Sequence, residues 1–117
     1  MFGLFTSGPK LSPQDAVTRA RAGEITLIDV RNHAEVRMTG KAKGALVVPL
    51  SVMPIKCDPK GPDFIAGIDP TKPIALYCAS GARSAQGARV LKRMGFEQVY
   101  NIGGLTHWHR AGGEIER

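Results

Sequence analysis

The chain has 117 residues, of which 43% are hydrophobic and 22% charged, a balance typical of one compact globular domain. It contains no long uncharged apolar run, which argues against a transmembrane helix. The net charge of +6 favours small anions or acidic partners, whereas the scattered basic residues and the few aromatic residues argue against nucleic-acid binding.

The domain is expected to span residues 12–116, preceded by an N-terminal arm at residues 1–11. No signal peptide is recognisable, because glycine, serine and proline interrupt the first apolar residues. Two cysteines, Cys57 and Cys78, are too few for a disulfide framework. We therefore expect a cytoplasmic protein, and we leave open whether it is a monomer or a homodimer.

The first half of the chain predicts two helical and two extended segments. Ser12 is placed to cap a helix that starts at Pro13 and ends before Gly23. A short apolar run at 25–30 predicts a buried strand. The elements that follow are a helical turn at 32–36, a loop at 40–44 and a strand at 45–48.

The segment 51–73 is the least regular part of the chain, because prolines and glycines recur throughout it. We expect one helical turn at 64–66 and a connection of the length that is often functional or mobile. The elements predicted after it are a strand at 73–77, a helix at 84–94, a strand at 98–101 and a helix at 105–111 with Trp108 buried.

Strands that alternate with helices indicate an α/β domain with helices on the faces of a parallel sheet. Ligands of such sheets bind beyond the carboxyl ends of the strands. Cys78 stands at the end of a predicted strand and is followed by a short loop and a helix. This position predicts a functional site around the Cys78 loop.

The loop Cys78-Ala79-Ser80-Gly81-Ala82-Arg83 has the composition of an anion cradle. Gly81 and the small alanines allow the backbone to curl, so that several N–H groups face one atom, and the following helix adds its positive end. Such a site favours the thiolate of Cys78 and suits the terminal sulfur of a persulfide. A thiolate that attacks sulfur needs no general base. Arg83 is a fixed positive charge that could bind an oxyanion.

These residues resemble the active loop of the rhodanese-like sulfurtransferase family, and other parts of the chain agree. Leu27-Ile28-Asp29-Val30-Arg31 with Glu35 resembles the family's Asp-Val-Arg element. Further similar stretches are Gly44-Ala45 with Pro49-Leu50, Gly95-Phe96, Val99-Tyr100-Asn101, Gly103-Gly104 and Trp108. The resemblance runs from about Ser12 to Glu116.

The resemblance implies a three-layer fold with a central parallel sheet of about five strands and helices on both faces. It also implies a two-step reaction without a cofactor or a metal ion, in which Cys78 takes sulfur from a small anionic donor such as thiosulfate. The acceptor would be cyanide, a thiol or a protein. The amides of Ala79, Ser80, Gly81, Ala82, Arg83 and Ser84 would cradle the persulfide, and Arg83 would orient the donor. Asp29 and Arg31 would serve the architecture near the site.

Three functional readings follow from the sequence. Four residues separate Cys78 from Arg83. In the phosphatases and arsenate reductases that this fold resembles, five residues separate the cysteine from the arginine. We therefore favour a thiosulfate sulfurtransferase, keep a non-catalytic binding or regulatory module as the alternative, and place a phosphatase or arsenate reductase a distant third.

Cys57 is either a resolving cysteine for the persulfide or an uninvolved loop residue. His107 and His109 do not share a helix face, so a metal site there is disfavoured.

One stretch departs from the family pattern. The residues Gly40 to Ala45 carry Lys41 and Lys43 where family members often have histidine and proline. This difference adds positive charge and predicts different local packing, without threatening the fold.

Overall fold

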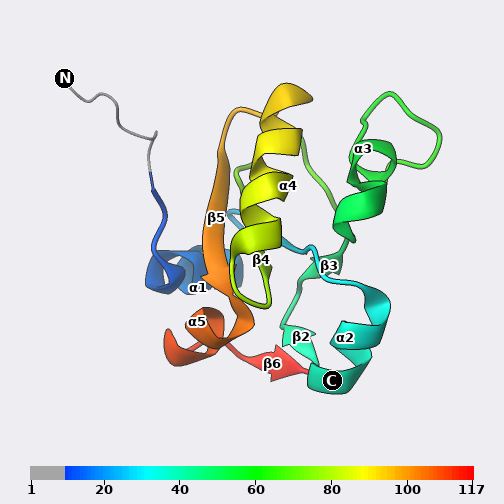
Figure 1. Cartoon of the computed structure of the whole chain (residues 1–117). Helices are drawn as coiled ribbons and strands as arrows, with labels where there is room; N and C mark the ends of the chain where they lie inside the picture. Colours follow the sequence, from blue (N-terminus) through cyan, green and yellow to red (C-terminus); the bar gives the residue numbers. More distant parts are fainter. Residues whose placement is uncertain (1–9) are drawn as a thin grey trace.

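The computed structural model describes residues 10–117, so most of the predicted N-terminal arm lies outside the described residues. A parallel sheet forms the centre of the domain (Figure 1). Its four strands lie in the order β3-β1-β4-β5. Its strands are β1 (Thr26–Asp29), β3 (Leu46–Val47), β4 (Ile74–Cys78) and β5 (Val99–Gly104). All three neighbouring pairs are parallel, as the continuous apolar runs predict.

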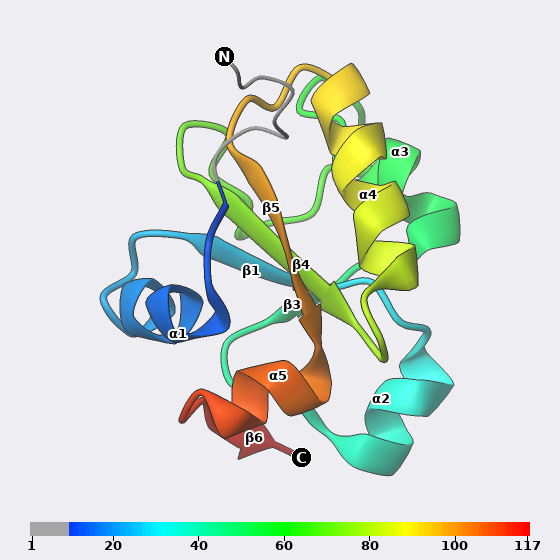
Figure 2. The ribbon, with the colours of Figure 1, turned by 60° about the vertical axis from the view of Figure 1, so that its left-hand side comes forward.

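Helices cover both faces of this sheet (Figure 2). On one face lie α3 (Met53–Lys56) and α4 (Ala82–Arg93), which pack over a core that includes Met53, Leu76 and Leu91. On the other face lie α1 (Pro13–Arg21) and α5 (Leu105–Arg110), which enclose a second core around Tyr77 and Trp108. The α/β architecture and the burial of Trp108 are thereby confirmed.

Local capping explains where two of the helices begin. The hydroxyl of Ser12 accepts a hydrogen bond from the backbone N–H of Asp15, as the sequence predicts for the start of α1. In α2 (His33–Thr39), Asn32 and Glu35 form a reciprocal capping box, in which each side chain accepts from the other residue's backbone N–H. This cap fixes the direction of the Glu35 side chain.

The central sheet has one strand fewer than the expected five or so. The segment 40–44, predicted to be a loop, contains the short strand β2 (Lys41–Ala42), which pairs antiparallel with β6 (Ile115–Glu116) in a separate sheet. The ammonium group of Lys41 donates to the carboxylate of Glu116 over 2.8 Å and to the backbone oxygen of Ala45 over 2.7 Å. A lysine that departs from the family pattern thus helps to join the two segments.

The irregular segment 51–73 also differs from its prediction. Residues 64–66 form no helix; instead a 3₁₀ turn (Leu50–Val52) leads into α3, where Pro54 occupies the first turn. Proline suits that position because its missing N–H would have no partner within the helix. Phe64 and Ile65 pack against the core, so burial rather than helix formation determines their conformation.

Within residues 10–117, none of the helices is both long and apolar enough to cross a membrane.

Candidate active site

Cys78 is the last residue of β4 and lies at the carboxyl edge of the sheet, where the loop to α4 begins (Figure 2). Its side chain is 1% exposed. Gly81 turns the chain into α4 with a φ of +109°, a conformation that L side chains rarely adopt. A Cβ atom on Gly81 would lie 3.3 Å from the Cα atom of Gly103, so the position also demands close packing.

The loop directs hydrogen-bond donors at the sulfur. The backbone N–H of Gly81 donates to Cys78 Sγ over 2.9 Å, and the Ser84 hydroxyl lies 3.4 Å from the same atom. Burial works to raise the pKa of the Cys78 thiol, but the Ser84 hydroxyl and the N–H groups of Ser84, Gly81 and Ser80 outweigh it, and the pKa is lowered. The site therefore favours a thiolate.

Asn101 on β5 is part of this site, although its side chain was assigned no role from the sequence. The Ser84 hydroxyl donates to Asn101 Oδ1 over 2.7 Å, and Asn101 Nδ2 donates to the carbonyl oxygen of Gly81 over 3.0 Å. The same Oδ1 accepts from the backbone N–H of Gly103. Asn101 thus fixes both the loop and the orientation of Ser84.

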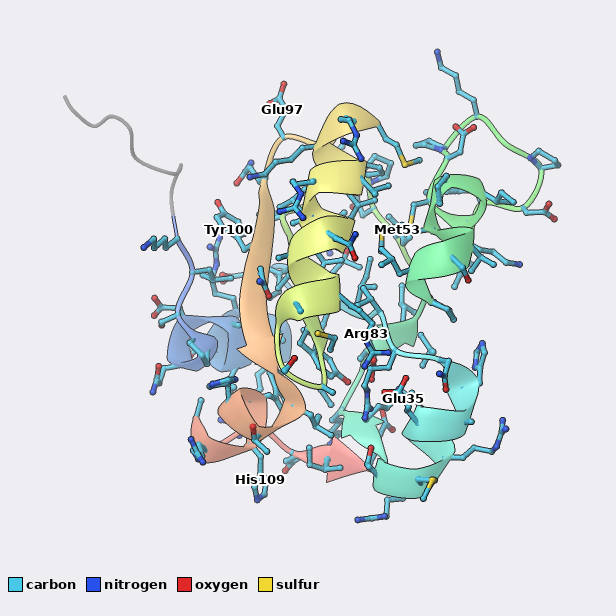
Figure 3. All side chains as sticks on the ribbon, in the orientation of Figure 1. Glu35, Met53, Arg83, Glu97, Tyr100 and His109 are labelled. Atoms are coloured by element: carbon cyan, nitrogen blue, oxygen red, sulfur yellow. The ribbon has the colours of Figure 1, made fainter. Side chains whose placement is uncertain are left out.

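The side chain of Arg83 reaches Glu35 on α2 (Figure 3). Its two terminal nitrogens lie 2.7 and 2.8 Å from the two carboxylate oxygens of Glu35. The arginine, together with the backbone N–H of Asn32, lowers the pKa of Glu35 to about 2. The charge that was expected to be available for a donor therefore has a bound partner in this structure.

Asp29 and Arg31 form a buried ion pair next to the site. The guanidinium of Arg31 contacts both carboxylate oxygens of Asp29 at 2.8 to 3.1 Å, and it also donates to the carbonyl oxygen of Gly40. Tyr77, which precedes Cys78, donates to Asp29 Oδ2 over 2.6 Å and accepts from the N–H of Ala42. This network joins β1, β4 and the segment before β3.

The remaining loop residues differ in how far they are exposed. Ala79, Ser80 and Ala82 are exposed, while Arg83 is partly buried and Ser84 fully buried. The loop therefore presents small side chains to the solvent and donors to its interior.

Cys57 is not the loop residue that the sequence suggests. It ends α3, is fully buried in the same core cluster as Cys78, and remains a free thiol. Burial raises its pKa to about 11. Such a thiol is a poor resolving cysteine, because attack on a disulfide or persulfide requires the thiolate.

His107 and His109 both lie on α5. His107 Nδ1 accepts the backbone N–H of Gly104 over 2.8 Å and so caps its own helix. Among residues 10–117, no three His, Cys, Asp or Glu side chains come together as possible ligands.

Comparison with known proteins identifies relatives of this chain. The chain is 32% identical over 90 residues to a sulfurtransferase of Allochromatium vinosum, a stretch that covers 76% of each protein. It is 30% identical to an HTH-type transcriptional regulator of Mycobacterium tuberculosis over 86% of this chain, but it spans only 44% of that regulator.

Solved structures share the fold. A Rhodopseudomonas palustris protein of unknown function, called a possible tyrosine phosphatase, superposes with a TM-score of 0.81 at 28% identity and covers 99% of both chains. A rhodanese-related protein of Thermoplasma volcanium superposes with a TM-score of 0.73 at 23% identity, over 93% of this chain and 98% of that one. The sequence profile of the rhodanese-like domain matches residues 12–111, and the chain therefore belongs to the rhodanese-like domain family.

Proposed function

We propose that this protein is a sulfurtransferase that carries sulfane sulfur as a persulfide on Cys78, within a domain that spans about residues 12–116. The observation that supports this proposal most is the cradle of N–H groups around Cys78 Sγ, in which Gly81 donates over 2.9 Å. Donors that stabilise a thiolate also stabilise the terminal sulfur of a persulfide, since both carry one negative charge.

In the first step the Cys78 thiolate attacks the sulfane sulfur of a donor. With thiosulfate, the new Sγ–S bond forms as the S–S bond of the donor breaks, and sulfite leaves with the electron pair. In the second step cyanide, a thiol or a protein nucleophile attacks the outer sulfur and restores the thiolate. Gly81, Ser84 and Ser80 would hold the negative charge through both steps.

Two observations support this function over the alternatives. A non-catalytic module would not need the donors that lower the pKa of the Cys78 thiol. The name of the Rhodopseudomonas palustris protein suggests phosphatase activity as an alternative. In this chain, however, Arg83 pairs with Glu35, and four residues rather than five separate Arg83 from Cys78. A reducing, cytoplasmic setting would suit the reaction, since it keeps such a thiol reduced.

Intact-mass measurement tests the proposal. Purified protein is mixed with thiosulfate, freed of excess donor and compared with a Cys78→Ser variant. We expect a gain of one sulfur, about 32 Da, that cyanide removes and that the variant lacks. Methanethiosulfonate and a small-molecule persulfide serve as further donors. A folded protein with reduced Cys78 that gains no sulfur from any of the three donors would refute the proposal, and release of p-nitrophenol from p-nitrophenyl phosphate would favour the phosphatase instead.

A further inference from the structure

Arg83 is the positively charged residue nearest in sequence to Cys78, and it already forms an ion pair with Glu35. The pair with Glu35 is bidentate, with distances of 2.7 and 2.8 Å, and the two side chains are 37% and 32% exposed. A bidentate guanidinium–carboxylate pair is among the strongest and most directional of polar contacts. A donor that binds Arg83 must therefore compete with this carboxylate.

Glu35 is also held independently of Arg83. One of its carboxylate oxygens accepts the backbone N–H of Asn32 over 3.1 Å, and its own N–H donates to Asn32 Oδ1 over 2.9 Å. Because the helix cap anchors Glu35, its negative charge stays at the rim of the site even when Arg83 moves.

The neighbouring ion pair, Asp29 with Arg31, carries no net charge either. Asp29 and Arg31 form a buried pair that acts electrostatically on Arg83 and Glu35. These four side chains comprise two cations and two anions, so they present no net positive charge. The attraction for an anion at Cys78 then comes mainly from the backbone N–H groups of the loop, which suit a single negative charge on sulfur.

We propose that Glu35 is a specificity residue that makes the site select singly charged sulfane donors, such as thiosulfonates and small persulfides, over doubly charged thiosulfate. The inference rests on the proposed sulfurtransferase function and names its substrate class. The loop amides accommodate the transferred sulfur with its one charge. The second charge of thiosulfate lies on its sulfonate group, where it would face the Glu35 carboxylate, while the guanidinium of Arg83 is already paired with that carboxylate.

The two donor classes react by the same balanced step. The Cys78 thiolate attacks the sulfane sulfur and the Sγ–S bond forms, while the bond from that sulfur to the rest of the donor breaks. Thiosulfate releases sulfite, methanethiosulfonate releases methanesulfinate, and a persulfide releases its thiolate, each with the bonding electron pair. In every case Cys78 ends as a persulfide anion, and no oxidant or reductant is consumed.

The test compares thiosulfate with methanethiosulfonate, which replaces one anionic oxygen by a methyl group. The kcat/KM for each donor is measured at constant ionic strength with cyanide as acceptor. In Glu35→Gln the charge is lost, while glutamine can still cap the helix. We expect the ratio of kcat/KM for thiosulfate to that for methanethiosulfonate to rise about tenfold, the effect of one partly exposed charge at short range.

Two variants serve as controls. Glu97→Gln makes the same change of charge near the far end of α4 (Figure 3), so it should leave the ratio at the wild-type value. Glu35→Asp keeps the charge but shortens the side chain, so its ratio should stay within about twofold of wild type, which separates charge from the geometry of the pair.

The outcomes distinguish this inference from the function on which it rests. A ratio that is unchanged in Glu35→Gln, in a protein whose Cys78 still takes up sulfur from both donors, would overturn the role of Glu35 alone. A wild-type protein that takes up no sulfur from either donor or from a persulfide would overturn the proposed function and this inference together.

Discussion

The hydroxyl of Ser84 offers the most direct test of how the site makes a thiolate. It lies 3.4 Å from Cys78 Sγ and works against the burial that raises the thiol pKa. In Ser84→Ala that donor is lost, while the backbone N–H groups of Gly81 and of residue 84 itself remain. We therefore expect the pKa of Cys78 to rise.

The strength of the hydrogen bond between Ser84 and Cys78 sets the size of the pKa increase. A hydrogen bond to a charged group contributes about 1.5–3 kcal/mol, and one pKa unit corresponds to about 1.36 kcal/mol. Ser84 has a single hydroxyl proton, which it also directs at Asn101 over 2.7 Å, so the lower end applies. The pKa of Cys78 should increase by about one unit.

The assay is the rate of alkylation of Cys78 by iodoacetamide as a function of pH, followed by intact mass. The buried Cys57 does not interfere, because its pKa of about 11 keeps it protonated. Ser80→Ala is the matched control, since it removes an exposed hydroxyl from the same loop and keeps the backbone N–H. A folded Ser84→Ala protein with the wild-type pKa would refute the reasoning and mean that the hydroxyl serves Asn101 alone.

Three further predictions follow from the structure. Tyr77→Phe removes the 2.6 Å hydrogen bond to Asp29 and leaves a buried backbone N–H unpaired, so urea denaturation should show a loss of about 1–3 kcal/mol; a loss below about 0.5 kcal/mol would contradict the role of the network. The pKa of Glu35 is lowered on folding from 4.5 to about 2, so the stability that this carboxylate contributes is present above pH 4.5 and is lost as the pH falls through about 2. Unfolding curves of Glu35→Gln should therefore depend less on pH in that window than those of wild type, and parallel curves would disprove the assignment. Cys57 should resist alkylation in the native protein and react after unfolding in urea, whereas modification of both cysteines at similar native rates would show that Cys57 is accessible.

Local sequence patterns were sufficient to predict the framework that carries the site. The cap at Ser12, the apolar run that becomes β4 and the small residues after Cys78 each depend on neighbours within a few positions. The local structure that each of these patterns forms is therefore largely independent of the rest of the chain. The parallel sheet and the position of Cys78 at its carboxyl edge followed from the order of these elements.

Burial overrode local preference in the segment 51–73. The apolar residues 64–66 suggested a helical turn, but Phe64 and Ile65 pack against the core as an irregular segment, and the helix forms at Met53–Lys56 instead. Cys57 looked like a loop residue beside prolines and lysines, and only packing shows that it is fully buried.

The sequence by itself determined the α/β fold and the Cys78 loop of this protein, because both depend on short periodic patterns and on glycine at one special backbone position. The tertiary structure decided which side chains surround that loop. Arg83 meets Glu35 across 48 positions, and Ser84 meets Asn101 across 17. Such contacts depend on how helices and strands pack against one another, and a one-dimensional pattern does not encode that packing in its spacing.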